Sequence, residues 1–148
     1  TRARAGLERR PPEPGAHDVA PKAGSRAEDA LVAKFVSAYE AADLDAVVAL
    51  LTDDVFMSMP PMPLEYEGRD LVTRFLAGIF DAGRRFDLVP TRANGQPAFG
   101  AYLRSPSGVR HGTGLIVLTL AGDRVSAMSR FDKSTFPWFG LPRSLPAK

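Results

Sequence analysis

The sequence predicts an α+β fold in which three N-terminal helices cover a curved antiparallel sheet and leave a cone-shaped space. Three observations support it. Apolar residues recur at helical spacing over most of residues 25–83, alternate as in strands over residues 86–132, and flank an Asn-Gly pair at residues 94–95. Helices gathered in one half and strands in the other are typical of an α+β domain, whose helices pack against one face of the sheet.

Capping signals mark the three helices. Ser25 with Glu28 three residues later forms a capping box, which predicts the start of the first helix. Asp43 caps a second, shorter helix that we expect to end at residues 52–54. A third helix opens after Gly68 and has an apolar stripe that continues almost to its end.

Alternation predicts the strands. Residues 55–59 form a short strand between the second and third helices, and prolines stop it. Residues 86–103 form a hairpin, and residues 109–120 and 124–132 continue it as a meander. The aromatic and Pro-punctuated residues 136–142 read as a flap over an apolar surface rather than as a strand.

The Asn94–Gly95 pair is the strongest turn signal in the chain. Both central residues of a type I′ turn need positive φ, which Asn tolerates and Gly adopts freely. The turn predicts that Ala93 lies opposite Gln96. Pro90 and Pro97 then occupy positions where the missing N–H faces away from the partner strand, so neither proline breaks the hairpin.

Composition limits the function classes. The 148 residues are 45% hydrophobic and 24% charged, as expected for one soluble domain. There is no cysteine, and the two histidines, His17 and His111, are far apart, so we expect no disulfide, no metal site and no cofactor. No signal peptide or membrane span is visible, which predicts a cytoplasmic protein with no membrane contact.

Charge separates the chain into two parts. Residues 1–26 carry six basic and three acidic side chains, and the remaining 122 residues have a net charge of −1. The domain itself therefore offers no basic surface for nucleic acid. We expect residues 11–24 to be a Pro-rich linker and residues 25–146 to be the folded domain. The chain starts at Thr1 rather than Met, so we expect a fragment or a processed product.

One pair of residues could carry acid–base chemistry. If residues 122–123 form the second hairpin loop, Thr113 lies opposite Asp132, and His111 is the diagonal neighbour of Asp132. This register places on one face His111, Thr113, Leu115, Val117, Met128, Arg130 and Asp132. A histidine oriented by a carboxylate can act as a general base. The alternative, which the sequence favours, is a structural or solvated histidine at the rim.

Further residues are candidates for the wall of the cone. Their common feature is a position near the predicted inner face, and they are Tyr39, Met57, Met59, Tyr102, Thr113, Arg130 and Trp138. Aromatic and methionine side chains at such spacing more often belong to the core, which remains the alternative.

Several stretches of the sequence match one known pattern, and they are residues 38–43, 45–51, 53–54, 58–61, 68–70, 90–102 and 139–142. Together they resemble one group of bacterial extracytoplasmic-function sigma factors of the sigma-70 family, which carry a C-terminal SnoaL-like domain of the nuclear transport factor 2-like superfamily. Residues 1–5 also resemble the Arg/Ala-rich last helix of sigma region 4, so residues 1–10 are a candidate remnant of that helix. The resemblance implies a SnoaL-like, cystatin-like α+β roll.

The resemblance also implies a function. The domain would regulate a sigma factor in transcription initiation, without being an enzyme, by acting on sigma regions 2 and 4 and on the RNA polymerase core. DNA would be contacted only through regions absent from this chain. Two alternatives stay open: an isomerase- or cyclase-type enzyme using His111 and Asp132, and a module that binds a small apolar ligand or forms a homodimer.

Overall fold

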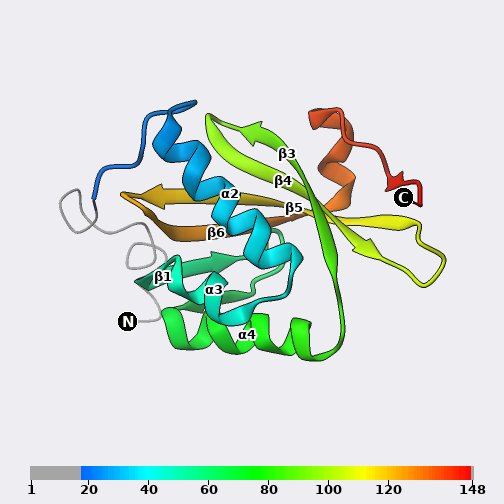
Figure 1. Cartoon of the computed structure of the whole chain (residues 1–148), viewed down its shortest axis with the longest axis horizontal. Helices are drawn as coiled ribbons and strands as arrows, with labels where there is room; N and C mark the ends of the chain where they lie inside the picture. The colour runs from blue at the N-terminus through cyan, green and yellow to red at the C-terminus, as the bar shows by residue number, and fades with distance from the viewer. Residues whose placement is uncertain (1–17, 148) are drawn as a thin grey trace.

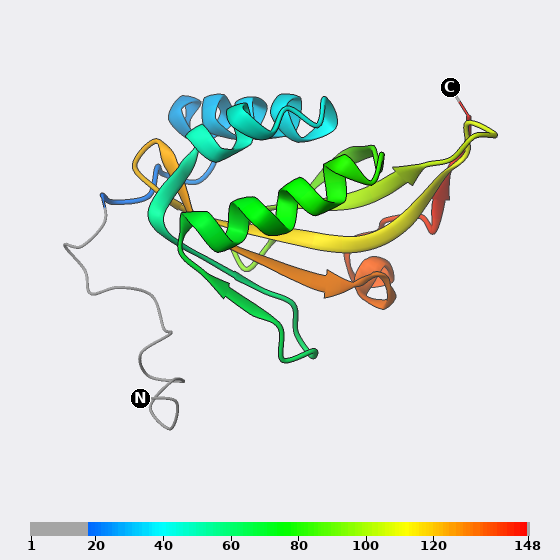
Figure 2. The same cartoon turned by 90° about the horizontal axis from the view of Figure 1, so that it is seen from below.

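The computed structural model describes residues 18–147, and it confirms the α+β fold: three helices lie against one face of a strongly curved sheet (Figures 1 and 2). In chain order the elements are α2 (Arg26–Glu40), α3 (Leu44–Ala49), β1 (Leu51–Ser58), β2 (Glu65–Glu67), α4 (Arg69–Asp81), β3 (Phe86–Ala93), β4 (Gln96–Arg104), β5 (Arg110–Ala121), β6 (Arg124–Asp132), the 3-10 helix η1 (Lys133–Phe139) and β7 (Ser144–Leu145). The predicted sigma remnant at residues 1–10 and most of the predicted linker at residues 11–24 lie outside the described residues.

Within the described residues the strands form one sheet in the order β2-β1-β6-β5-β4-β3, with β7 added beside β5. Strands β3 to β6 form the predicted antiparallel meander. The sheet as a whole is mixed, however, because β1 runs parallel to β6. No tight turn joins these two strands, since α4 and most of the meander lie between them in the chain, so their direction was not set by a hairpin. No helix of residues 18–147 has the length and apolarity needed to cross a membrane.

The first strand begins earlier than the sequence suggested. We expected the second helix to run to residues 52–54, but α3 ends at Ala49 and β1 starts at Leu51, which is fully buried. The caps were placed correctly: the side chains of Ser25 and Asp43 accept hydrogen bonds at the starts of α2 and α3.

The Asn94–Gly95 hairpin has the predicted register along its whole length. Ala93 pairs with Gln96, and Pro90 pairs with Phe99. Asn94 has a φ of 53° and Gly95 a φ of 77°, the left-handed values that a type I′ turn requires.

The register between β5 and β6 differs from the prediction by one residue. Gly114, rather than Thr113, lies opposite Asp132, and the pairing shifts between Thr119 and Leu120. Ser126 is the extra residue on β6 and forms a bulge. No turn signal in the sequence predicts this bulge. Because a one-residue slip moves every side chain to the opposite face, the predicted face composition of β5 is wrong over this segment.

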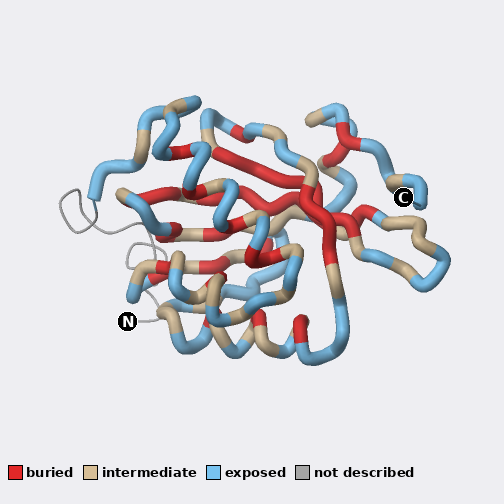
Figure 3. The backbone as a smooth tube through the Cα atoms, viewed as in Figure 1, coloured by how far each residue is buried: buried red, intermediate tan, exposed pale blue. Residues whose placement is uncertain are grey.

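The sheet has apolar clusters on both faces. Figure 3 shows buried residues concentrated along the central strands. The larger one fills the space between the helices and what we call the inner face. The smaller one lies on the outer face, where Phe136 of η1 and Leu141 pack on Tyr102 and its neighbours. The expectation of a flap at residues 136–142 therefore describes the outer-face cover, although η1 and the short β7 give it more regular structure than expected. Figure 2 shows η1 on the side of the sheet opposite α2.

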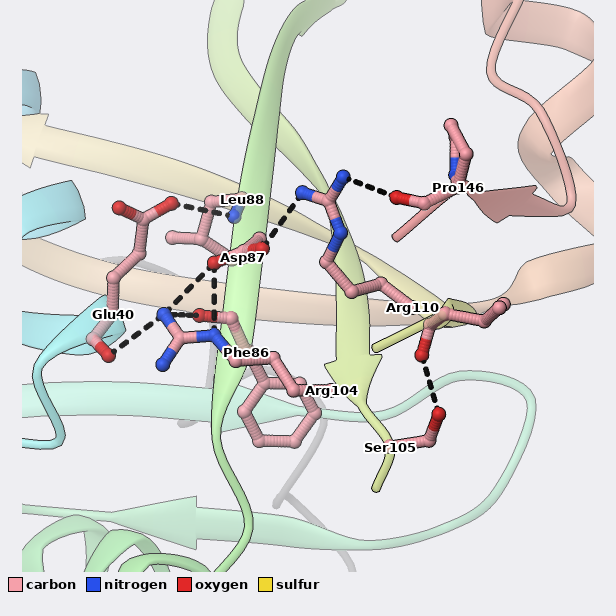
Figure 4. Close-up of polar contacts among 9 residues, drawn as sticks. Glu40, Phe86, Asp87, Leu88, Arg104, Ser105, Arg110 and Pro146 are labelled. Carbon is pink, nitrogen blue, oxygen red and sulfur yellow. Dashed lines mark hydrogen bonds and ion pairs between the residues drawn. The ribbon is translucent and has the colours of Figure 1, made fainter. Parts of the chain in front are cut away.

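A buried carboxylate joins four elements and the C-terminal segment (Figure 4). Asp87 of β3 is 7% exposed, and its two carboxylate oxygens accept hydrogen bonds from Arg104 of β4 at 3.0 Å and Arg110 of β5 at 2.8 Å. Arg104 also donates to the backbone carbonyl of Glu40, at the end of α2, and Arg110 donates to that of Pro146. The carboxylate of Glu40 accepts the backbone N–H of Leu88 at 2.8 Å.

A second buried acid ties the start of α2 to the hairpin. Glu28 is 4% exposed, and Arg92 donates two parallel hydrogen bonds to its carboxylate at 3.0 and 2.9 Å. Arg92 also donates to the carbonyl of Gly95 in the turn. These hydrogen bonds from Arg92 hold the pKa of Glu28 below its ordinary value, against the opposing effect of burial.

Arg92→Met should lower the free energy of unfolding at pH 7 by about 2 kcal/mol, because it leaves a buried carboxylate without its charged donor. The wild-type advantage is present above the ordinary pKa of Glu28 and is lost as pH falls through its lowered folded-state pKa. Urea unfolding from pH 7 to pH 3 would measure both effects. Arg26→Met, at an exposed site on the same helix, is the matched control. A difference that stays constant down to pH 3 would contradict the role given to Glu28.

Asp87→Asn should cost about 3–5 kcal/mol of stability, because two guanidinium groups lose their shared counter-charge in a mostly buried place. Asp81→Asn, at the exposed end of α4, should change stability by less than about 0.5 kcal/mol. Urea denaturation of the two variants side by side gives the comparison. Equal losses of unfolding free energy in the two variants would show that the ion pairs of Asp87 do not stabilise the fold.

Candidate functional site

A cavity of about 290 Å³ lies between the helices and the inner face of the sheet. Its apolar wall consists of Met57, Met59, Phe75, Leu76, Ile79, Phe86, Ala101, Ile116 and Met128. Its polar groups are Tyr39, Arg84, Thr113, Ser129 and Arg130. An apolar concave space with few polar groups is the usual form of a small-molecule site.

Tyr39 is held in this wall by aromatic neighbours. It lies near the end of α2, stacks on Phe35 with ring centroids 5.6 Å apart, and meets Phe80 edge-on at 5.5 Å and Phe86 at 5.8 Å. Burial raises the pKa of Tyr39 to about 12, so the phenol is neutral at physiological pH and its O–H remains a donor. Among residues 18–147 this hydroxyl has no hydrogen-bond partner. Tyr39 borders the cavity, and its hydroxyl keeps some accessible surface.

A bulge in β5 positions Arg130. Ala101 pairs with Gly114 but its neighbour Tyr102 pairs with Gly112, so Thr113 is the extra residue. The Thr113 hydroxyl donates to the carbonyl of Ala101 at 3.0 Å, and the Thr113 carbonyl accepts a hydrogen bond from Arg130 at 2.8 Å. A Cβ atom on Gly114 would lie 2.8 Å from the backbone carbonyl oxygen of Phe131 and 2.9 Å from the guanidinium carbon of Arg130. The backbone oxygen cannot move aside as a side chain could, so a glycine is favoured at this point.

A second guanidinium stands near the cavity. Arg84 is exposed in the connection from α4 to β3, and its guanidinium carbon lies 5.8 Å from the centre of the Phe86 ring. Within the described part of the chain neither Arg84 nor Arg130 forms an ion pair with a carboxylate. The residues that line the cavity include no Asp, Glu or His, so the charged groups there are both cationic.

His111 and Asp132 lie elsewhere. They line a groove of about 580 Å³ beside η1, with Gly112, Lys133, Ser134 and Pro137. Asp132 is the N-cap of η1, and the backbone N–H of Ser134 donates to its carboxylate at 3.0 Å, which holds the pKa of Asp132 below its ordinary value. In the part of the chain that the structure covers, no hydrogen bond or ion pair joins His111 to Asp132. The groove brings the two residues near each other but keeps them out of the cavity.

The predicted wall residues divide between the two faces. The structure places Tyr39, Met57, Met59, Thr113 and Arg130 in the cavity lining. Tyr102 and Trp138 are corrections. Tyr102 points to the outer face, where its hydroxyl donates to the carbonyl of Pro142 at 2.7 Å, and Trp138 is 84% exposed on η1. Tyr102 alternates along β4 with Phe99 and Ala101 of the inner cluster, so it faces outward once the inner face is known. Trp138 belongs to η1, which covers the outer face.

Sequence reasoning missed three kinds of wall residue. The sequence predicts an apolar stripe on the third helix but not that Phe75 and Ile79 in it line the cavity, and no pattern marks Ser129. Arg84 was also missed, although a basic pair directly before an apolar strand is a visible signal for a cation at the sheet margin. Over residues 18–147 the structure has no cluster of His, Asp and Glu side chains that could hold a metal ion.

A family model described as a SnoaL-like domain matches residues 32–132. The ECF RNA polymerase sigma factor SigG of Mycobacterium tuberculosis is 38% identical over 118 residues, which is 78% of this chain and 32% of SigG. The chain thus spans about a third of the length of this curated relative.

Solved structures share the fold. A ketosteroid isomerase candidate from Kribbella flavida superposes with a TM-score of 0.58 at 21% identity, over 76% of this chain and 82% of that protein. An LEH-like epoxide hydrolase of M. tuberculosis has a TM-score of 0.55 at 20% identity, over 73% of this chain and 83% of that one. A cystatin-fold protein from Novosphingobium aromaticivorans has a TM-score of 0.57 at 18% identity, over 72% and 98% of the two chains. At these identities the likeness concerns the fold alone.

The environment of Tyr39 can be measured by phenolate absorbance. The difference between wild type and Tyr39→Phe should titrate near pH 12 rather than near 10, because burial opposes formation of the phenolate. Circular dichroism at each pH would define the range over which the fold is native. A midpoint near 10 in folded protein would show that the hydroxyl is fully hydrated.

Proposed function

The chain belongs to the SnoaL-like domain family, and we propose that it is the regulatory, non-enzymatic domain of an RNA polymerase sigma factor. The observation that carries the proposal is the 38% identity with SigG, which extends over 78% of this chain. A match of that extent to one sigma factor is a stronger guide to biological role than the fold, which many unrelated activities share.

The proposal assigns partners and parts. Residues 25–146 would be the regulatory domain, residues 11–24 its linker, and residues 1–10 the end of sigma region 4. The domain would act in the cytoplasm on sigma regions 2 and 4 and thereby on binding of the RNA polymerase core. Contact with promoter DNA would come from regions outside these 148 residues, in agreement with the net charge of −1 on residues 27–148.

The geometry of the cavity supports a non-catalytic role. An isomerase or cyclase needs a general base within reach of the bound substrate. The cavity lining supplies no carboxylate and no imidazole, and its phenol, Tyr39, stays neutral. The candidate base His111 lies in the outer groove, and Asp132 there is engaged in capping η1. No observation therefore raises the enzyme alternative above the regulatory one.

The first test is the coding sequence upstream of Thr1. The proposal expects sigma regions 2 and 4 in the same reading frame. An upstream sequence that encodes neither region would refute it.

The second test measures regulation directly. The proposal expects the sigma factor that contains this chain to differ from a variant that ends at residue 24. The two should differ several-fold in affinity for core RNA polymerase or in transcript yield. The single tryptophan, Trp138, is 84% exposed and gives a fluorescence signal for the separately expressed domain as upstream sigma fragment is added. Trp138→Phe is the signal control. Equal polymerase binding and equal transcription with and without the domain would contradict a regulatory role.

A further inference from the structure

We propose that the inner cavity binds a small amphipathic monocarboxylate, with the carboxylate on Arg130 and Arg84 and the apolar body among the methionines and aromatic side chains. The inference concerns the cavity of this chain and goes beyond the sigma-factor proposal. Ligand binding to the isolated 148-residue chain tests it.

The charge of the cavity is uncompensated. Arg69, Arg92, Arg104 and Arg110 each have a carboxylate oxygen at 2.8–2.9 Å. Arg130 is also half-buried, yet within residues 18–147 its guanidinium has only the carbonyl of Thr113 as a partner. A guanidinium in an apolar wall gains most from an anionic oxygen that reaches it, because water there is scarce and the charge-assisted hydrogen bond is strong.

The neighbouring polar groups favour the same kind of ligand. Tyr39 presents a neutral hydroxyl with no partner in the described residues, and Arg84 adds a second cation. With no Asp or Glu in the lining, nothing there repels a carboxylate. Ligands whose polar group is a cation would meet two positive charges and no counter-charge.

The remaining wall fixes the body of the ligand. Met57, Met59 and Met128 contribute thioether side chains that adapt to irregular shapes, and Phe75 and Ile79 close the α4 side. The volume of about 290 Å³ lies just below the range of ~300–1,000 Å³ typical of drug-sized ligands. The space therefore suits a short alkyl or single-ring acid rather than a long fatty acid or a nucleotide.

The backbone holds the anchor ready for such a ligand. The bulge at Thr113 turns its carbonyl to Arg130, and Gly114 makes room for the guanidinium. Among residues 18–147 the other guanidinium donors have no partner. An arginine held by one neutral acceptor keeps donors for a bidentate carboxylate without any rearrangement of the fold.

The test compares acids with their own primary amides, so that only the charge of the head group changes. Hexanoate, benzoate and 4-phenylbutyrate are each paired with the corresponding amide and added to the 148-residue chain. Thermal unfolding and isothermal titration calorimetry measure binding. At least one acid should raise the Tm and bind about tenfold or more tightly than its amide, which corresponds to ~1.4 kcal/mol.

Matched variants locate the interaction. Arg130→Gln should remove the preference for acid over amide, and Arg84→Gln should weaken it several-fold. Arg74→Gln, at an exposed site on α4 outside the cavity lining, should leave it intact. Arg84 is exposed, so its variant gives an answer even where Arg130→Gln does not fold.

Three results would overturn the inference: no shift of Tm with any acid at millimolar concentration, equal binding of acid and amide, or an equal loss of binding in Arg74→Gln. The sigma-factor proposal is tested by upstream sequence and polymerase binding, so its failure is distinguishable from failure of ligand binding.

Discussion

Two one-residue bulges in the meander decide what the inner cavity is made of. The bulge at Ser126 sets the pairing of β6 with β5, so that Arg130 lies opposite Ile116 and Met128 opposite Leu118 on the inner face. The bulge at Thr113 then adds a second extra residue, this time on β5. Side chains alternate strictly along a strand, so each bulge exchanges the faces of everything beyond it. Without the bulge at Ser126, alternation would turn Arg130 to the outer face, away from the space that Tyr39 borders.

The second requirement of the cavity is a fixed helix, and α2 is tied at both ends. At its start the buried Glu28 carboxylate holds Arg92 of the hairpin. At its end the carbonyl of Glu40 accepts from Arg104, and the carboxylate of Glu40 accepts the N–H of Leu88 (Figure 4). Tyr39 precedes Glu40 by one residue, so the same contacts position the phenol. These polar contacts add orientation that apolar packing lacks, because hydrogen bonds are directional.

Local signals explain which parts of the fold could be predicted. Ser25, Asp43 and the Asn94–Gly95 turn act over two to four residues, and the structure has each of them as predicted. Pairing of β1 with β6 joins residues more than 70 positions apart, as in Ser58 with Ser129, and no turn chemistry encodes its direction. No local sequence signal predicts the bulges either, because they arise from packing across several strands at once. The same limit applies to the cavity lining. Helical spacing predicted Tyr39, and strand alternation predicted Met57 and Met59. The position of Arg84 and the choice of the outer face for Tyr102 depend on the assembled sheet.

The bulge at Thr113 also connects the two faces of the sheet. On the inner side its carbonyl holds Arg130. On the outer side the adjacent Gly112 packs so tightly on η1 that an added Cβ would lie 2.5 Å from the Phe136 ring, and its N–H donates to the carbonyl of Arg143. The same strand segment therefore contacts both the cavity-lining Arg130 and the C-terminal residues on the outer face. Residues 112–114 thus join the guanidinium that faces the cavity to the outer surface that η1 covers.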